Sequence, residues 1–220
     1  MASTTDFLVI GGGVIGLTLS MRLKQKYQNS RVVLIEKEKS CGMHASGRNS
    51  GVLHAGFYYT ADSLKAKFTR DGNRMLTEYC LDRGIRINRC GKLVVAKNAA
   101  ELKGLDELLE RGRKNGVALQ QVTEKEAKEI EPRVRTRERA LFSPTTSVIN
   151  PSDVIASMAG DAKNSGVDIQ TDTMYLKRSS DGVVTSKGPV STGYVINASG
   201  LYADKIALDF GFSKNYRILP

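Results

Sequence analysis

The chain has 220 residues, of which 40% are hydrophobic and 25% are charged, with 21 glycines and 5 prolines. This globular composition excludes collagen-like, disordered and mucin-like chains, and no apolar run approaches the roughly 20 residues that a membrane span requires. The formal net charge is +10, from 33 Lys and Arg against 23 Asp and Glu.

An excess of positive charge is typical of proteins that contact nucleic acid, an anionic membrane or an anionic small substrate, and also of a solvated surface. The basic residues are dispersed, and their one dense group, Arg133–Arg139, is interrupted by Glu138. That dispersion favours a solvated surface. Trp is absent and aromatic residues make up 6% of the chain, so base stacking is poorly supplied and we expect no nucleic-acid partner.

The three cysteines and two histidines also limit the chemistry. Cys41, Cys80 and Cys90 are odd in number and form no Cys-x-x-Cys pair, which argues against a disulfide framework and favours a reducing compartment. His44 and His54 are the only histidines, and we expect no metal site. The N-terminus lacks the basic region of a signal peptide. We therefore expect a cytoplasmic protein.

The first 36 residues are typical of a βαβ unit. Residues 6–10 are a short apolar run that ends in three glycines, which predicts a buried strand entering a tight turn. Residues 14–26 have the pattern of a helix with one face packed on a sheet. Residues 31–36 are apolar on both faces, as the strands of parallel sheets are.

A glycine motif joins the first predicted strand to the helix. Gly11-x-Gly13-x-x-Gly16 provides a tight turn, a close approach of the backbone to a pyrophosphate, and close packing of helix on strand. The free N–H groups and the helix dipole attract the diphosphate. Glu36 lies 20 residues beyond Gly16, where a carboxylate accepts hydrogen bonds from an adenosine ribose. The motif predicts an adenine dinucleotide and leaves its identity open.

The rest of the chain alternates between helices and short strands. We predict an ordered loop over residues 40–61, then helices over 63–80, 99–114 and from 123 to Pro132, with a strand over 90–96. Ser63 is a candidate N-cap, and Thr123–Glu126 is a capping box. After a strand over 140–143 and a helix from Asn150 to about residue 164, three strands are expected, near residues 167–171, 183–186 and 193–197, with turns at 181–182 and 187–189.

These elements predict an α/β fold: a doubly wound, Rossmann-like parallel sheet with a β-meander and part of a second, α+β domain. The composition changes near residues 90 and 148, which indicates an insertion. We assign residues 1–89 and 148–205 to the dinucleotide-binding domain, and residues 90–147 and 206–220 to part of a substrate domain.

Two further segments narrow the assignment: residues 46–56, S-G-R-N-S-G-V-L-H-A-G, and residues 194–200, Y-V-I-N-A-S-G. With them the chain resembles the N-terminal half of the D-amino-acid-oxidase-like FAD oxidoreductases, and within that group the L-2-hydroxyglutarate dehydrogenases/oxidases. The most similar stretches are N-S-G-V-L-H-A-G-F-Y-Y (Asn49–Tyr59), S-L-K-A-K-F (Ser63–Phe68), C-G-K-L-V-V-A (Cys90–Ala96) and I-N-A-S-G-L-Y-A-D-K-I (Ile196–Ile206). The resemblance implies that the rest of the substrate domain follows Pro220, so we expect this chain alone to bind FAD weakly.

The resemblance implies FAD as the cofactor, with flavin and substrate meeting between two domains. It implies FAD contacts at Gly11, Gly13, Val14, Ile15, Gly16, Glu36, Lys37, Ser46, Gly47, Asn49, Ser50, Gly51, Ala198 and Gly200. The small residues of 46–51 suit a flat isoalloxazine ring, and an ordinary Ser/Gly surface loop is the alternative. For residues 197–200 the alternative is a plain turn at the end of a strand.

His54 is the candidate catalytic residue. Oxidation of a 2-hydroxy acid removes the hydroxyl proton while hydride leaves C2 for flavin N5, and a neutral imidazole can accept that proton near pH 7. The resemblance implies that His54 lies beside the flavin. Three interpretations stay open: a general base, a flavin contact or covalent link, and a core histidine. We assign His44 no role.

Three residues are candidates for the substrate pocket: Tyr58, Tyr59 and Lys92. A tyrosine hydroxyl or an ammonium group can hold the carboxylate of a hydroxy acid. The alternatives are aromatic packing for the tyrosines and a solvated strand position for Lys92.

The function that the resemblance implies is FAD-dependent oxidation of an L-2-hydroxy acid, first of all L-2-hydroxyglutarate to 2-oxoglutarate. The alternatives are an amine, amino-acid or glycerol-3-phosphate oxidising flavoprotein of the same superfamily, or an inactive FAD-binding module. Quinone and oxygen are both open as electron acceptors. The basic surface leaves peripheral contact with the inner face of a membrane open, although no amphipathic anchor is evident. The oligomeric state is not predicted.

Overall fold

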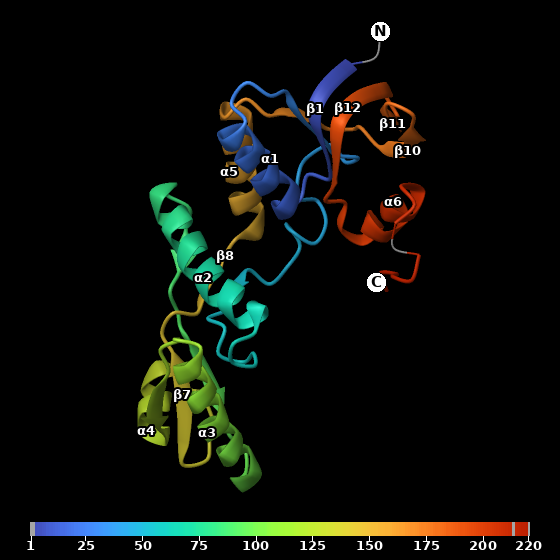
Figure 1. Ribbon diagram of the computed structural model, residues 1–220. Helices are drawn as coiled ribbons and strands as arrows, with labels where there is room; N and C mark the ends of the chain where they lie inside the picture. The colour runs from blue at the N-terminus through green and yellow to red at the C-terminus, as the bar shows by residue number, and fades with distance from the viewer. Residues whose placement is uncertain (1–2, 213, 220) are drawn as a thin grey trace. The chain divides into compact units, whose positions relative to one another are not determined.

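The computed structural model describes residues 3–212 and 214–219. Ser213 and Pro220, which belong to the predicted terminal part of the substrate domain, lie outside the described residues, as do Met1 and Ala2. The chain divides into two compact units, Met1–Asn49 with Pro151–Pro220, and Ser50–Asn150. Figure 1 shows the elements of each unit.

The first unit is built on a six-stranded sheet with the order β10-β11-β12-β1-β2-β9. Its parallel strands are β1 (Ser3–Ile10), β2 (Val32–Ile35), β9 (Asp168–Gln170) and β12 (Gly188–Asn197). An antiparallel meander, formed by β10 (Tyr175–Ser179), β11 (Gly182–Thr185) and β12, extends one side of the sheet. The predicted α/β class and the β-meander are therefore confirmed.

Both faces of this sheet are buried, and successive side chains along β1 point to opposite faces. Leu8 and Ile10 of β1 share one core cluster with Ile206 of α6 (Ala203–Asp209), which follows the short helix η1 (Gly200–Tyr202). Val9, on the other face, meets α1 (Val14–Lys26) at Gly16. The helix α5 (Pro151–Asn164) contacts α1. Helices thus cover both faces, as a doubly wound sheet requires.

The second unit holds two three-stranded antiparallel sheets. One has the order β3-β8-β4, from β3 (Val52–Leu53), β8 (Ser147–Ile149) and β4 (Ile87–Asn88). The other has the order β5-β7-β6, from β5 (Lys92–Val95), β7 (Arg139–Ser143) and β6 (Gln120–Thr123). The helices are α2 (Leu64–Asp82), α3 (Ala99–Lys114) and α4 (Glu124–Ile130). Leu102 and Leu105 of α3 pack on Leu141 of β7.

The predicted helix starts are confirmed by their caps. Ser63 Oγ accepts a hydrogen bond from Ala66 N–H at 3.1 Å. Thr123 and Glu126 form both hydrogen bonds of a capping box. The helix predicted over residues 99–114 has those bounds, and its N-cap Asn98 accepts from Glu101 N–H.

The strand predictions need correction. We did not predict β3, β4, β6, β8 or β10, and the predicted loop over residues 40–61 contains β3. The strand expected near residues 193–197 begins at Gly188, so the turn predicted at 187–189 is too late by about two residues. Gly188 has φ of +114° and pairs with Thr185 across the hairpin. No helix in the described ranges combines the length and apolar character that a bilayer crossing demands.

Candidate functional site

The glycine turn between β1 and α1 admits no side chain at two of its positions. Gly11 has φ of +113°, and a Cβ there would lie 2.5 Å from the carbonyl oxygen of Ala198. A Cβ at Gly16 would collide with the carbonyl oxygen of Gly11. A Cβ at Gly13 would stand 3.0 Å from Ser46 Oγ. The turn, called the glycine cradle below, is therefore closely packed backbone in which only glycine fits, with Gly12 and Gly16 buried and Gly11 and Gly13 half-buried.

The N-terminus of α1 offers unpaired donors at this cradle. Val14 N–H donates to Ser46 Oγ at 3.0 Å. Among residues 3–212 and 214–219, no group accepts a hydrogen bond from the N–H of Gly13 or Ile15. The first turn of α1 carries no acidic residue of its own, and the carboxylate of Glu36 accepts from Gly12 N–H, one residue before the N-cap. Such a terminus binds a phosphate group.

Glu36 lies at the end of β2, directly beside the turn. Its side chain is 8% exposed, and its Oε2 accepts a hydrogen bond from Gly12 N–H at 2.7 Å. Its Oε1 accepts from Glu38 N–H at 3.0 Å. Two carboxylate oxygens have about four acceptor positions, so Glu36 keeps the capacity to accept from a ribose hydroxyl.

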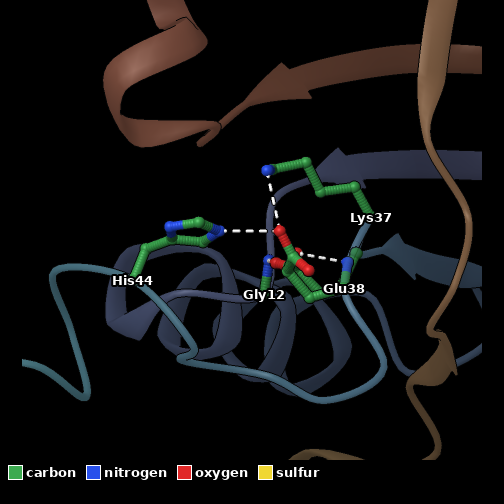
Figure 2. Close-up of polar contacts among 5 residues, drawn as sticks. Gly12, Lys37, Glu38 and His44 are labelled. Atoms are coloured by element: carbon green, nitrogen blue, oxygen red, sulfur yellow. Dashed lines mark hydrogen bonds and ion pairs between the residues drawn. The ribbon is translucent and has the colours of Figure 1, made fainter.

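A charged cluster follows Glu36 (Figure 2). Glu38 Oε1 lies 2.8 Å from Lys37 Nζ and 2.9 Å from His44 Nε2. The hydrogen bonds from Lys37 and then from His44 lower the pKa of Glu38 to about 2. The same hydrogen bond to Glu38 raises the pKa of Lys37, whose ammonium lies 5.0 Å from the ring centroid of Tyr202. His44, to which we assign no role from the sequence, thus pairs with Glu38.

The loop after β2 is attached to the glycine turn. Gly42 N–H donates to the carbonyl oxygen of Gly12 at 3.0 Å. A Cβ at Gly12 would lie 2.8 Å from Cys41 Sγ, and burial, with the charge of Glu36 second, raises the pKa of the Cys41 thiol. Asn49 Nδ2 donates to the carbonyl oxygens of Ala45 and Ser46, each at 3.0 Å. Ser46 therefore reaches the diphosphate end of the predicted site, whereas we had grouped it with the flavin ring.

The end of β12 lies against the same turn. Ala198 N–H donates to the carbonyl oxygen of Ile10 at 2.9 Å, because β1 and β12 are parallel neighbours whose carboxyl ends meet. Gly200, with φ of +58°, begins η1. The structure thus brings Gly11, Glu36, Ser46 and Ala198 together around one turn.

A cavity of about 520 Å³ lies within the same unit, between the loop after β2 and α5. Its lining includes the cations Lys39, Arg48 and Lys163 together with Cys41. The sequence did not indicate it, because Lys163 follows the loop by more than a hundred residues.

His54 belongs to the second unit and follows β3. Its side chain is exposed, between the buried Leu53 and Ala55, so the interpretation as a core histidine is wrong. Ser50 and Gly51 begin the same unit. Figure 1 shows this segment leading into α2.

Each of the two candidate substrate tyrosines lies near a lysine ammonium group. Lys92 Nζ lies 4.5 Å from the ring centroid of Tyr58, so the structure brings these two together. Tyr59 has Lys65 Nζ at 4.5 Å from its ring centroid. The Tyr58 ring also packs on Phe57, with centroids 4.2 Å apart. Two aromatic–cation pairs therefore follow His54.

Arg111 of α3 and Asn115, the C-cap of α3, hold the segment Gly56–Tyr59. We did not identify either residue from the sequence. Arg111 Nη1 donates to the carbonyl oxygen of Tyr58 at 2.8 Å. Asn115 Nδ2 donates to the carbonyl oxygens of Gly56 and Tyr59 at 3.1 and 2.9 Å. Their partners lie more than 50 residues away, and the one local signal was the Asn115-Gly116 helix end.

Comparison with known proteins gives the family. The DAO family of FAD-dependent oxidoreductases matches residues 6–220. L-2-hydroxyglutarate dehydrogenase of Escherichia coli K12 is 36% identical over 220 residues, which cover 98% of this chain and 52% of that protein. The mitochondrial L-2-hydroxyglutarate dehydrogenase of Homo sapiens is 34% identical over 235 residues, covering 99% of this chain and 50% of that protein. The chain spans about half the length of these curated relatives.

Solved structures agree on the fold. L-proline dehydrogenase from P. horikoshii superposes with a TM-score of 0.84 at 25% identity, covering 97% of this chain and 57% of that one. L-α-glycerophosphate oxidase from Mycoplasma pneumoniae with FAD bound gives 0.84 at 29% identity, covering 94% and 57%. With the match over residues 6–220 and the glycine cradle beside Glu36, the chain belongs to the DAO family of FAD-dependent oxidoreductases.

Proposed function

We propose that the intact protein binds FAD and oxidises an L-2-hydroxy acid, with L-2-hydroxyglutarate, converted to 2-oxoglutarate, as the substrate. The observation that carries the cofactor is the glycine cradle at Gly11–Gly16, which leads into the N–H groups of Gly13 and Ile15, free among the described residues, and has Glu36 beside it. The similarity of 34–36% to L-2-hydroxyglutarate dehydrogenases from bacteria and mitochondria supports the substrate.

The described residues fit the cofactor. The free N–H groups of Gly13 and Ile15 would hold the diphosphate, and Gly11, Val14 and Gly16 would line it, since the N–H of Gly11 donates to Ile35 and that of Val14 to Ser46. Glu36 and Lys37 would hold the adenosine, and Ala198 and Gly200 would complete the wall beside the turn. Gly47, Asn49, Ser50 and Gly51 would bind toward the flavin, and Ser46 would bind at the diphosphate end. FAD, when bound, supplies the acceptor for the hydride from C2 of the substrate.

The residues of the second unit would act on the substrate. His54 Nδ1 or Nε2 takes the hydroxyl proton as hydride leaves C2, so that the alcohol becomes a ketone and the imidazole becomes cationic. A flavin contact or a covalent flavin link is the alternative role for His54. Tyr58, Tyr59 and Lys92 would hold the carboxylates, since the ammonium of Lys92 supplies charge and the tyrosine hydroxyls supply hydrogen bonds.

Anaerobic reduction of the flavin tests this proposal. We expect L-2-hydroxyglutarate to bleach the flavin of the intact protein, and L-amino acids and glycerol 3-phosphate to leave it oxidised. Bleaching by an amino acid or by glycerol 3-phosphate instead would favour the alternative oxidases of the superfamily. A flavin that no substrate bleaches would favour a binding module without turnover.

The finer assignments are part of the same proposal. We place the FAD domain at residues 1–89 and 148–205, and part of the substrate domain at 90–147 and 206–220. Oxygen and quinone are the two proposed acceptors, and the rates at which each reoxidises the reduced flavin separate them. The cysteines Cys41, Cys80 and Cys90 are free, which supports a cytoplasmic location, with contact at the inner face of a membrane as the alternative.

A further inference from the structure

The segment Gly56–Tyr59 has no helix or strand of its own, although it follows the candidate catalytic His54 by two residues. Its shape depends on donors from elsewhere. Three of its four carbonyl oxygens accept hydrogen bonds from side chains at the C-terminal end of α3, two from Asn115 Nδ2 and one from Arg111 Nη1. Side-chain donors thus replace a strand ladder here.

Asn115 is itself buried, and its backbone is hydrogen-bonded to two helices. It is 5% exposed and is the C-cap of α3, where its N–H donates to the carbonyl oxygen of Arg111 at 2.9 Å. Its carbonyl oxygen accepts from Arg70 Nη1 of α2 at 3.1 Å. Val117, two residues later, shares a core cluster with Ala55 and Phe57. The amide of Asn115 therefore has a fixed position relative to the segment after His54.

The amide of Asn115 acts here only as a donor. Both of its hydrogen bonds run from Nδ2, and its buried Oδ1 has no partner among the described residues. An unpartnered buried acceptor costs stability. The hydrogen bonds of the Asn115 side chain are thus directed to the segment Gly56–Tyr59 alone.

We infer that Asn115 is a positioning residue of the oxidation reaction: it fixes Gly56–Tyr59, so that His54 and the Tyr58–Lys92 pair keep one geometry toward the substrate. Arg111 adds one further hydrogen bond to the same segment, at Tyr58. The inference rests on the proposed function for the role of His54. A displacement of about 1 Å in a reacting group is enough to cost on the order of 10²-fold in rate.

Turnover by variants of the intact holoenzyme is the first test. Asn115→Ala removes both donors, and Asn115→Asp keeps the volume but sets a carboxylate against two carbonyl oxygens. We expect each to lower kcat at least tenfold with a smaller change in KM. The matched control is Asn98→Ala, which removes the N-cap at the other end of α3. It should destabilise the same helix and leave kcat within twofold. Equal losses of kcat in all three variants would overturn the inference.

A milder pair of variants covers the case in which Asn115 variants fail to fold. Arg111→Gln removes the hydrogen bond to Tyr58 at a half-buried position, and Arg113→Gln, on the exposed face of α3, is its control. We expect kcat to fall about threefold or more for the first, and to stay unchanged for the second. Identical kcat in the two variants would count against a positioning role for these hydrogen bonds.

Amide hydrogen exchange separates this inference from the proposed substrate, because it needs none. In the FAD-loaded protein, residues 55–59 should exchange at least tenfold faster in Asn115→Ala than in Asn98→Ala. If wild-type flavin is not reduced by L-2-hydroxyglutarate, the proposed substrate is wrong. The exchange result still shows whether Asn115 fixes the segment Gly56–Tyr59. Equal exchange in the two variants would show that Asn115 does not fix the segment.

Discussion

Single residues define the nucleotide end of the site. At Gly11 and Gly16 the backbone approaches other backbone so closely that a methyl group has no room, and Glu36 fixes the turn through Gly12 N–H. The motif predicted the tight turn at Gly11 and the close packing at Gly16, because these two glycines meet each other within five residues. It did not predict the contacts of Gly11 with Ala198 or of Gly12 with Glu36, whose partners are distant in sequence. The hydrogen bond from Val14 N–H to Ser46 Oγ was not predictable, since nothing in residues 40–51 fixes how that loop returns.

Gly16→Ala tests the cradle. Because the added methyl group collides with backbone that cannot move away, we expect FAD affinity to fall at least tenfold, and stability to fall by about 1–3 kcal/mol. Gly160→Ala is the control, since a Cβ at Gly160 in α5 meets open space and should stabilise the helix by about 0.5–1 kcal/mol. Flavin fluorescence titration and urea denaturation measure both. Wild-type FAD affinity in Gly16→Ala would contradict the prediction.

The Glu38 cluster predicts a pH dependence. Hydrogen bonds from Lys37 and His44 lower the pKa of Glu38 from the ordinary 4.5 to about 2 in the folded protein. A carboxyl group of this kind stabilises the fold above pH 4.5, and its contribution is lost as the pH falls from 4.5 toward 2. Glu38→Gln should therefore lower the melting temperature at pH 7, and the difference from wild type should narrow by pH 3. A difference that stays constant with pH would exclude this linkage.

Secondary-structure elements divide into those whose ends are set locally and those set by distant pairing. Ser63 and the Thr123–Glu126 box bind backbone within three residues, so the helix starts were predictable. The two-residue strands β3 and β4 form only because each pairs with β8, which lies near the C-terminal end of the second unit, Ser50–Asn150. β10 reads Tyr-Leu-Lys-Arg-Ser, an edge strand whose charges resemble a loop.

Ser63→Ala tests the cap of α2. The hydroxyl of Ser63 satisfies Ala66 N–H, so its loss should cost about 1 kcal/mol of unfolding free energy. Ser63→Asp keeps an acceptor at the N-terminus of the helix and should stay within about 0.5 kcal/mol of wild type. Urea denaturation compares the three proteins. An alanine variant as stable as wild type would show that the cap does not contribute.

At the scale of the whole molecule, the boundaries between compact units differ from those drawn for the predicted domains. Residues 50–89 belong by their contacts to the same unit as 90–147, although composition placed the boundary near residue 90. The physical reason lies in long-range hydrogen bonds within that unit. Asn115 binds Gly56 and Tyr59, and Asn73 Nδ2 donates to the carbonyl oxygens of Leu53 and Thr145. Composition along a sequence carries no trace of such contacts.

The second unit should fold by itself. Residues 50–150 are one continuous segment with core clusters of their own, centred on Leu105 and Phe57. We expect the isolated segment to unfold cooperatively with heat and to show dispersed amide resonances. A segment without a cooperative transition would show that its core depends on the remainder of the protein.

The pairing of β3 with β8 places Val52 opposite Val148 and Leu53 opposite Ser147, so the polypeptide enters and leaves this segment through adjacent backbone. A piece of chain with neighbouring ends behaves as a cassette: another sequence with the same end-to-end spacing can take its place without stretching the sheet that carries it. Exchange of such cassettes would let one nucleotide-binding framework acquire new substrate chemistry, by recombination at two sites only.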